Sequence, residues 1–399
     1  MSTIGTSNIK FSQVRLAINN SSCRGGSAIA NTDVTFSSFR NSLLASSNNS
    51  FVDKNPFNAP SARAYHSSVL TNDHKIVVFG GFSFTTTSID PIDLHNDTYL
   101  YDIKNNTWSE LHNGTGDAPS KRFLHKCVYD GIRNTMYLFG GELDTNNTTS
   151  DELWKFDLST NTWSEIRITV ETKPTKRSAH NLEIGGNVIY LFGGINGLAP
   201  DVTVYNELWK FDIINTQWTR GSNATNKNRS TASSVITNGN IYIFGGVDED
   251  SNVLNDIITY NPNDDTWDLS FYSGGTPGTT IPPKLSNSSM DLLTSTCFLI
   301  YGGKDGNDNY VEDIWEFHVE NKTWKKIFGG ATTNMITKRA NHSMNIDNVD
   351  DTVTMIVFGG SISSTGYINK TYSYTLSTIF GFDNNAPLKL SDLSGQEFY

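Results

Sequence analysis

The chain has 399 residues, of which 37% are hydrophobic and 12% aromatic, and its formal net charge is −11. An acidic balance of this size disfavours nucleic acid as a partner, because a phosphate backbone repels a negative surface. No apolar run approaches the length that crosses a membrane, and the first residues lack the basic and apolar regions of a secretory signal. We therefore expect no nucleic-acid partner and no membrane span, with a cytoplasmic location unless the chain joins a larger assembly.

Residues 1–48 form a predicted tail whose charge opposes that of the whole chain. The tail contains Lys10, Arg15, Arg24 and Arg40 but only one acidic residue, Asp33. This local basic excess separates the tail from the acidic remainder. We therefore treat residues 1–48 as a basic anchor segment that precedes the main domain.

Two segments of this tail, residues 9–15 and 34–40, resemble each other, and residues 388–393 resemble both. Each is a short apolar stretch followed by a serine able to cap a short helix. The segments resemble parts of structural proteins from large DNA viruses and tailed phages. That resemblance implies attachment to viral capsid or tail proteins; a tail that packs on the folded domain or serves as a linker is the alternative. The predicted anchor side chains are Phe11, Val14, Phe36, Phe39, Leu390 and Leu393.

An aromatic residue followed by two glycines recurs six times, at a spacing of 52 to 60 residues. Each copy ends an apolar run, as in residues 76–79 and 241–244, which is typical of a strand buried on both faces. A repeat of this length is one supersecondary unit that buries its faces against its neighbours. The six aromatic positions are Phe79, Phe139, Phe192, Phe244, Tyr301 and Phe358.

Two further landmarks follow the same period. A tryptophan stands after each of the first five glycine pairs, and an Arg-x-x-His sequence opens four units. Together these motifs resemble the kelch repeat over residues 49 to 380, which implies an all-β, six-bladed propeller with four strands in each blade. Residues 381–399 then form a C-terminal tail. The tryptophans are Trp108, Trp163, Trp218, Trp267 and Trp324, and the Arg/His pairs are Arg63/His66, Arg122/His125, Arg177/His180 and Arg339/His342.

The sixth unit lacks its outermost strand, because no tryptophan follows residues 369–375 at the expected distance. Residues 49–53 instead copy the tryptophan-bearing strand at 161–165, with Phe51 in the aromatic position. We predict that this N-terminal strand completes the last blade and removes an open sheet edge. Local closure by Phe380 or Phe382 is the alternative.

The connections between predicted strands are long on one face only. Strand direction alternates in a blade, so connections between the second and third strands share a face with those between blades. Insertions on a rigid ring collect on the face that carries function. We predict that this face binds a protein or a glycan. The candidate binding residues on it are Phe82, Phe84, Asp144, Asn196, Asp248, Glu249 and Lys304.

One arginine opens each of five units, and two roles are open for this set. The guanidinium groups either hold acidic residues of adjacent blades or form a ring at the channel mouth that grips a carboxylate or an acidic glycan. The set is Arg63, Arg122, Arg177, Arg229 and Arg339.

No catalytic residue, metal site or cofactor is predicted. The four histidines of the repeat are expected to be structural, and the three cysteines show no metal-binding spacing. Residues 305–309 faintly resemble a calcium loop, but Tyr310 stands where its sharp turn needs glycine. The copper ligands of galactose oxidase and the iron motif of plant specifier proteins, both on kelch propellers, have no counterpart here.

The preferred prediction is a non-enzymatic binding module that is tethered by its tails to a larger assembly such as a virion, where it would serve host recognition. A free cytosolic kelch adaptor that holds a peptide across the channel mouth is the first alternative. An enzyme acting on sugar acids is the second, although the sequence identifies no acid/base pair for it.

Overall fold

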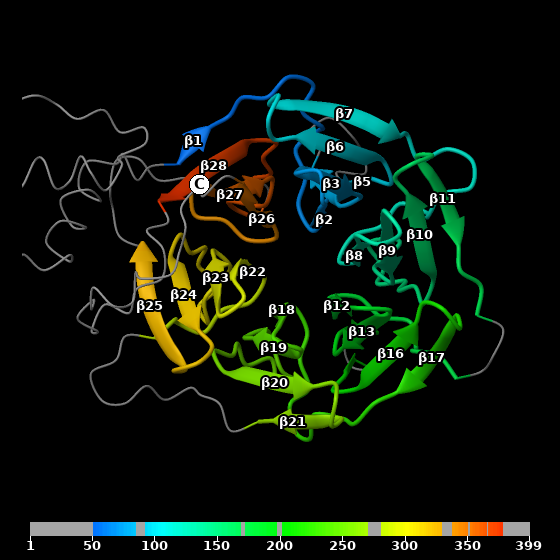
Figure 1. Ribbon diagram of the computed structural model, residues 1–399, viewed down its shortest axis with the longest axis vertical. Helices are drawn as coiled ribbons and strands as arrows, with labels where there is room; N and C mark the ends of the chain where they lie inside the picture. The colour runs from blue at the N-terminus through cyan, green and yellow to red at the C-terminus, as the bar shows by residue number, and fades with distance from the viewer. Residues whose placement is uncertain are drawn as a thin grey trace, which may run out of the picture. The chain divides into compact units, whose positions relative to one another are not determined.

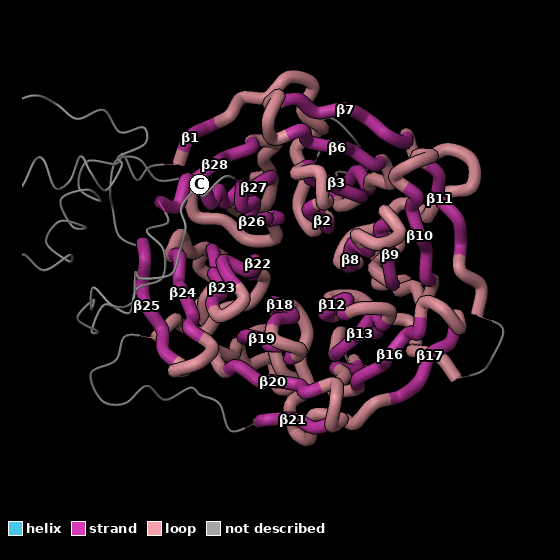
Figure 2. Tube along the Cα trace, in the orientation of Figure 1, coloured by secondary structure: helices cyan, strands magenta, loops and turns pink. Residues whose placement is uncertain are grey.

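The computed structural model describes residues 51–84, 92–168, 172–197, 202–269, 281–328, 337–349, 352–364 and 366–377. These residues belong to one compact unit, 49–378. Every regular element in them is a strand, and the rest is loop (Figure 2). No helix in the described ranges is long and apolar enough to cross a membrane.

Six four-stranded antiparallel sheets surround a central axis as the blades of a propeller (Figure 1). The predicted all-β, six-bladed architecture is therefore confirmed. The strands nearest the axis are β2 (Ser67–Leu70), β8 (Lys126–Asp130), β12 (Asn181–Gly185), β18 (Ser233–Thr237), β22 (Ser289–Thr294) and β26 (Ser343–Val349). The second strands are β3 (Lys75–Phe79), β9 (Thr135–Phe139), β13 (Val188–Phe192), β19 (Asn240–Phe244), β23 (Cys297–Tyr301) and β27 (Thr352–Phe358).

The outer half of each blade completes this order. The third strands are β6 (Thr98–Asp102), β10 (Leu153–Asp157), β16 (Leu208–Asp212), β20 (Ile257–Asn261), β24 (Ile314–His318) and β28 (Thr371–Ser377). The outermost strands are β7 (Thr107–His112), β11 (Thr162–Glu165), β17 (Gln217–Arg220), β21 (Thr266–Asp268), β25 (Thr323–Phe328) and β1 (Val52–Asp53). Two short hairpins extend blades 1 and 3: β4 (Phe82–Phe84) with β5 (Ile92–Leu94), and β14 (Ile195–Asn196) with β15 (Thr203–Val204).

The glycine pair is required where each second strand ends. Gly80 and Gly81 have φ values of 65° and 92°, a region that favours glycine. A Cβ on Gly80 would also lie 2.8 Å from the carbonyl oxygen of Arg122 in the next blade. The repeat therefore needs glycine both for its backbone conformation and for the close approach of neighbouring blades.

The aromatic residue of each outermost strand packs on the preceding blade. The rings of Trp163 and Phe79 are 4.9 Å apart, and the Trp163 indole N–H donates to Thr98 Oγ1 at 3.0 Å. The same contact crosses the junction of the first and last blades, where Trp108 lies 4.7 Å from Phe358. The tryptophans of the repeat therefore pack between neighbouring blades.

The N-terminal strand closes the ring. β1 pairs with β28, so that Val52 lies opposite Ser373 in the sixth blade. The Phe51 ring takes the tryptophan position, 4.9 Å from Tyr374 and 5.8 Å from Tyr301. Closure by the N-terminal strand is confirmed, and the alternative residues Phe380 and Phe382 lie outside the described ranges.

Six residues that precede the innermost strands form a closed ring of backbone hydrogen bonds around the axis. Each N–H donates to the carbonyl oxygen of its counterpart in the preceding blade at 2.8–3.1 Å. All six have φ between 53° and 58°, which is uncommon for residues other than glycine. This ring fixes the mutual position of the blades at one end of the channel. Its members are Tyr65, Leu124, Ala179, Thr231, Asn287 and Asn341.

Candidate functional site: the long-loop face

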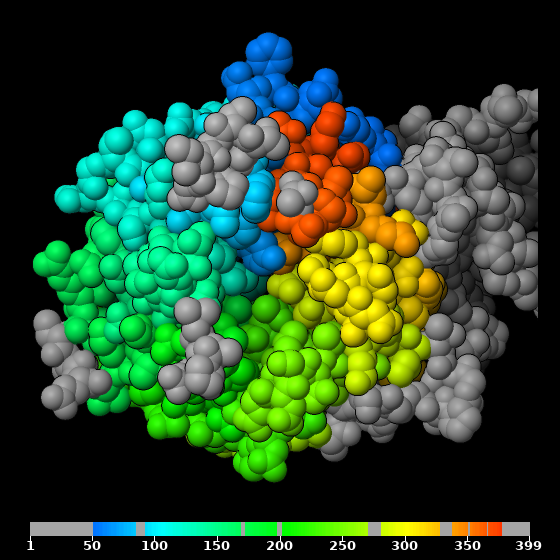
Figure 3. All heavy atoms as spheres, turned by 180° about the vertical axis from the view of Figure 1, so that it is seen from behind, coloured from blue at the N-terminus to red at the C-terminus, as the bar shows by residue number. Residues whose placement is uncertain are grey.

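The strand order places two kinds of connection on opposite faces of the propeller. Links between the second and third strands, and links between blades, lie on what we call the long-loop face (Figure 3). The turns that join the first to the second strand, and the third to the fourth, form the short-turn face. All seven loop residues selected from the sequence belong to the long-loop face, and their role in binding stays a prediction.

Phe82 lies below the surface of the long-loop face. Its side chain is buried, stacked on Tyr65 at 5.1 Å and in edge contact with Phe123 at 4.9 Å. Neighbouring blades cover Phe82, so its side chain offers little surface to a ligand, and its part in binding stays a prediction. Phe84, two residues further along β4, is half-buried and stacks on Tyr367 at 6.1 Å.

Asp144 and Asp248 turn towards their own loops. The Asp144 carboxylate accepts backbone N–H groups from Asn146 at 2.8 Å and Thr148 at 3.0 Å, and the hydrogen bonds of Thr148 lower its pKa. Asp248 accepts from Asp250 and Asn252 in the same way. These carboxylates shape five-residue turns, which leaves less of their hydrogen-bonding capacity for a partner.

The segment that faintly resembled a calcium loop is a third copy of this turn. Asp305 accepts the backbone N–H groups of Asn307 at 2.8 Å and Asn309 at 2.9 Å. Its oxygens thus have a structural use without an ion, as in blades 2 and 4.

The remaining loop candidates have different surroundings. Asn196 accepts a hydrogen bond from the Thr149 hydroxyl and so joins the loops of blades 2 and 3. Lys304 lies 2.7 Å from Asp308 and 5.1 Å from the centre of the Tyr310 ring. Glu249 is exposed.

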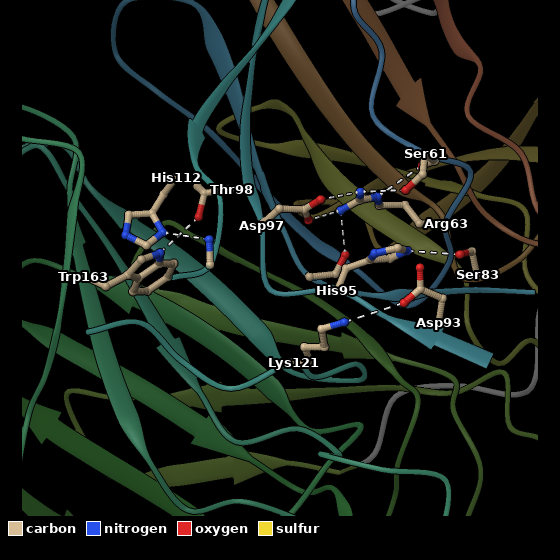
Figure 4. A network of polar contacts seen from close by, with 12 residues as sticks. Ser61, Arg63, Ser83, Asp93, His95, Asp97, Thr98, His112, Lys121 and Trp163 are labelled. Carbon is tan, nitrogen blue, oxygen red and sulfur yellow. Dashed lines mark hydrogen bonds and ion pairs between the residues drawn. The ribbon is translucent and has the colours of Figure 1, made fainter. Parts of the chain in front are cut away.

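The five repeat arginines are fully buried and cannot form an exposed ring for a ligand. In Figure 4, Arg63 points at Asp97 and Ser61 within blade 1, and it also donates to the Gly80 carbonyl at 3.1 Å. Four of the five pair with a carboxylate of their own blade, so the expectation of acidic partners in adjacent blades is corrected as well. The pairs are Arg63 with Asp97, Arg122 with Glu152, Arg177 with Glu207, and Arg229 with Asp256.

Backbone atoms of the same arginines reach the preceding blade. The Gly81 N–H of blade 1 donates to the Arg122 carbonyl at 2.9 Å, while the Arg122 guanidinium holds Glu152 at 2.6 Å. Each arginine therefore joins two blades, with its backbone on one and its side chain on the other. Such charge-assisted pairs are strong when they are buried and fully bonded.

The repeat histidines are also structural. His125 lies edge-on to Phe79 of the preceding blade at 5.2 Å, and His180 repeats this contact with Phe139 at 5.4 Å. Burial lowers the pKa of His66 to about 3, so this imidazole is neutral at physiological pH. The expected structural role is confirmed for these side chains.

The long-loop face carries a cluster of half-buried aromatic side chains, of which sequence reasoning had selected only Phe84. We call Tyr65, Phe84, Tyr310 and Tyr367 the aromatic patch; they come from blades 1, 5 and 6. The Phe82 ring joins two of these side chains, since it lies 5.1 Å from Tyr65 and 5.3 Å from Tyr367. Burial raises the pKa of Tyr65, and the phenols of Tyr367 and Tyr310 raise it further.

The patch is confined to one side of the ring. Tyr310 and Tyr367 form matching bridges to Lys304 and Ser361, which identifies equivalent positions in the other blades. In the other blades, this position holds an aliphatic residue or threonine. The equivalents are Leu94, Thr149, Val204 and Val253. An alignment of the repeats that places Tyr310 and Tyr367 at one position would have singled out these two side chains from the sequence.

The central channel contains a cavity of about 430 Å³ lined by the innermost strands. Burial raises the pKa of Glu183 to about 7 and that of Asp291 to about 6, and it lowers the pKa of Lys126. Ser234 donates to Glu183 at 2.6 Å, and the Ile346 N–H donates to Asp291 at 2.7 Å. These contacts tie neighbouring blades together inside the channel.

Comparison with known proteins agrees with this geometry. A profile described as "KLHDC2/KLHL20/DRC7 Kelch-repeats domain" matches residues 88–279, and a "Kelch motif" profile matches residues 62–113. The repeats of this chain are kelch repeats. Both matches lie inside the propeller, so the likeness of the tails to viral structural segments stays a prediction.

Individual kelch proteins are similar to the chain at low identity. Kelch domain-containing protein 3 of Rattus norvegicus is 26% identical over 287 residues, which span 66% of this chain and 70% of that protein. Kelch domain-containing protein 10 of Homo sapiens is 27% identical over 192 residues, 47% of this chain and 40% of that protein. The Leucine-zipper-like transcriptional regulator 1 homolog of Drosophila melanogaster is 24% identical over 269 residues, 65% and 26% of the two chains.

Proposed function

We propose that this kelch propeller is a non-enzymatic protein-binding module that holds a segment of a partner protein against its long-loop face. The aromatic patch is the centre of the contact. The observation that carries the proposal is the gathering of Tyr65, Phe84, Tyr310 and Tyr367 on one side of this face. At the position of Tyr310 and Tyr367, blades 2 to 4 carry Thr149, Val204 and Val253 instead.

The chemistry of the patch suits a protein partner. Tyrosine and phenylalanine are enriched at the centres of protein interfaces, where they add large apolar area, and a phenol keeps a polar group at the edge. The side chains are half-buried, and Phe84 already stacks on Tyr367 with the rings only 4° from parallel. A patch held in place in this way loses little conformational entropy when a partner covers it.

An acidic glycan is disfavoured as the ligand. That expectation depended on exposed guanidinium groups, and all five repeat arginines are buried. A segment of protein chain that places apolar side chains on the patch needs no such cation. The partner we expect therefore offers leucine-like or aromatic side chains from an extended segment.

Photo-crosslinking from the two faces tests this function. A photoreactive amino acid would replace Ser363, which is exposed in a long-loop connection of blade 6, or Ile132, which is 81% exposed on the short-turn face. We expect a defined protein crosslink from position 363 and none from position 132, with loss of the first when Phe84→Ala is added. A crosslink from position 132 alone would contradict the proposal, as would binding to a glycan array without any protein crosslink.

Attachment through the tails is a separate prediction. It depends on the basic excess of residues 1–48 and on the six anchor side chains, which lie outside the described ranges together with residues 381–399. We predict association with a virion through capsid or tail proteins, with a cytoplasmic location as the alternative. Comparing the intact chain with a chain that lacks residues 1–48 tests this. Incorporation into an assembly by the intact chain alone would support attachment through the tail, and equal behaviour of the two chains would contradict it.

A further inference from the structure

Blade 5 brings three metal-ligating residue types together at one end of its sheet. Cys297 begins β23, and Glu316 and His318 lie near the end of β24. Cys297 is directly opposite His318 in the antiparallel pair, and Glu316 is two residues from His318 on the same strand. Side chains alternate along a strand, so all three project from the same face of the blade.

The distances between the ligand atoms are close to those of a metal centre. Cys297 Sγ lies 3.2 Å from Glu316 Oε1, and His318 Nε2 lies 3.2 Å from the same oxygen. One ligand atom from each residue falls within 4.8 Å of the other two. Bonds of about 2.0–2.3 Å in a tetrahedral zinc site separate ligand atoms by roughly 3.3–3.8 Å. Small side-chain rotations would therefore bring all three atoms to one ion.

The repeat itself gives no reason for these residues in blade 5. Blades 1 to 4 carry other residue types at the same three positions. The equivalents of Cys297 are Lys75, Thr135, Val188 and Asn240; those of Glu316 are Leu100, Lys155, Lys210 and Thr259; those of His318 are Asp102, Asp157, Asp212 and Asn261.

The position of His318 normally supports the next turn. Asp102 accepts the backbone N–H of Asn105 at 2.8 Å, and Asp157 accepts that of Ser159 at 2.7 Å. Blade 5 replaces this carboxylate with an imidazole that is directed at Glu316. Blade 5 thus carries ligand types at all three positions and lacks the turn contact that blades 1 to 4 make.

We infer that Cys297, Glu316 and His318 form a site for one divalent transition-metal ion, with water completing its coordination. A thiolate, an imidazole and a carboxylate together favour zinc among the common ions. Binding replaces the proton of the Cys297 thiol with the metal and releases that proton to solvent. The Cys297 sulfur is buried while the His318 side chain is 41% exposed, so the ion has a strong inner ligand and an approach from solvent.

The spacing of the ligands explains why the sequence did not indicate this site. Cys297 and His318 belong to different strands and become neighbours only through the register of β23 and β24. Both lie at the short-turn end of blade 5, because β23 begins and β24 ends there. The metal site is therefore separate from the aromatic patch, and its test does not depend on the proposed partner.

Metal titration of the full chain tests the site. Chelator-treated, reduced protein would be titrated with zinc in competition with a chromophoric chelator, and with cobalt to detect thiolate-to-metal charge transfer. We expect one tightly bound ion per chain and a thiolate–cobalt band. Cys297→Thr and His318→Asn, which introduce residues that blades 2 and 4 already carry, should each weaken binding by more than about 100-fold, since even outer-shell changes cost 10- to 100-fold.

Two control variants remove a cysteine and a histidine that lie outside the proposed site. Cys127→Ala removes the other described cysteine, and His74→Asn removes an imidazole that lies 2.7 Å from Asp347; both should leave zinc affinity and the cobalt band unchanged. Binding by the wild-type chain that survives Cys297→Thr and His318→Asn would be an adventitious ion only and would overturn the inference. Absence of a thiolate–cobalt band in the wild-type protein would overturn it without any variant.

Discussion

Two regions of the molecule differ in how regularly their residues repeat: the contacts between blades, which we call the framework, and the surface of the long-loop face. Between blades, the same contacts recur around the ring: a glycine pair and an outer aromatic residue in every blade, and a buried arginine in five of the six, as in Gly81, Trp163 and Arg122. On the long-loop face the blades differ, so that Tyr367 of blade 6 has Val204 as its counterpart in blade 3. The repeated contacts between blades stabilise the fold, whereas the residues of the long-loop face that differ between blades are available to bind a partner.

The largest expected effect comes from the framework. Arg122→Ala removes a buried guanidinium from the Gly140 carbonyl and from Glu152, whose carboxylate keeps the hydrogen bond from the Trp154 indole. We expect the free energy of unfolding to fall by about 3–5 kcal/mol. Arg167→Ala is the matched control, because Arg167 pairs with Glu165 on the surface and is 83% exposed. Its loss should cost less than about 1 kcal/mol. Chemical denaturation of both variants checks this, and equal effects would remove the distinction between framework and surface.

Ring closure should be the next most sensitive feature. Phe51→Ala removes the ring that packs on Tyr374 and Tyr301, and we expect a loss of about 2–3 kcal/mol because the side chain is half-buried. Phe57→Ala, at a residue that is 76% exposed, should be nearly neutral. Thermal unfolding that Phe51→Ala leaves unchanged would show that β1 does not hold the sixth blade closed.

The channel predicts a smaller, pH-dependent effect. Burial raises the pKa of Glu183 to about 7, so the folded state keeps its proton at a pH where the unfolded state has lost it. This contribution is complete below the unfolded pKa and is lost as pH rises through about 7. Glu183→Gln should reduce the decline in stability between pH 5 and pH 8 by about 1 kcal/mol, a modest figure because the side chain is only half-buried. Denaturation at the two pH values, with the exposed Glu249→Gln as control, measures it; an identical decline in Glu183→Gln would contradict the assignment.

The difference between the two regions also decides how far the sequence could predict them. The framework is encoded by its period, so Phe51 could be assigned to the last blade because it copies Trp163. The burial of Phe82 could not be predicted, because the rings that cover it are Tyr65, from another position of the repeat, and Phe123, from the next blade.

The arginines and the metal ligands show the same limit. The repeat predicted the positions of the five buried arginines, but the local sequence does not indicate which blade supplies the carboxylate that pairs with each of them. Cys297 and His318 meet only through strand register, and the aromatic patch gathers residues from three blades. Local pattern therefore predicts the repeated contacts, whereas sites assembled from unlike residues of different strands need the structure.

The smallest expected effect on stability is also the most informative about function. Tyr367→Ala should lower the free energy of unfolding by only about 0.5–1 kcal/mol, because its half-buried ring stacks on Phe84 at the surface. Its effect on the dissociation constant for the crosslinked partner, measured beside Ile214→Ala on the short-turn face (62% exposed), tests the central claim most directly. We predict at least about a tenfold loss of affinity for Tyr367→Ala and none for Ile214→Ala. Unchanged affinity for Tyr367→Ala, or a loss for Ile214→Ala instead, would contradict the assignment of the long-loop face as the binding surface.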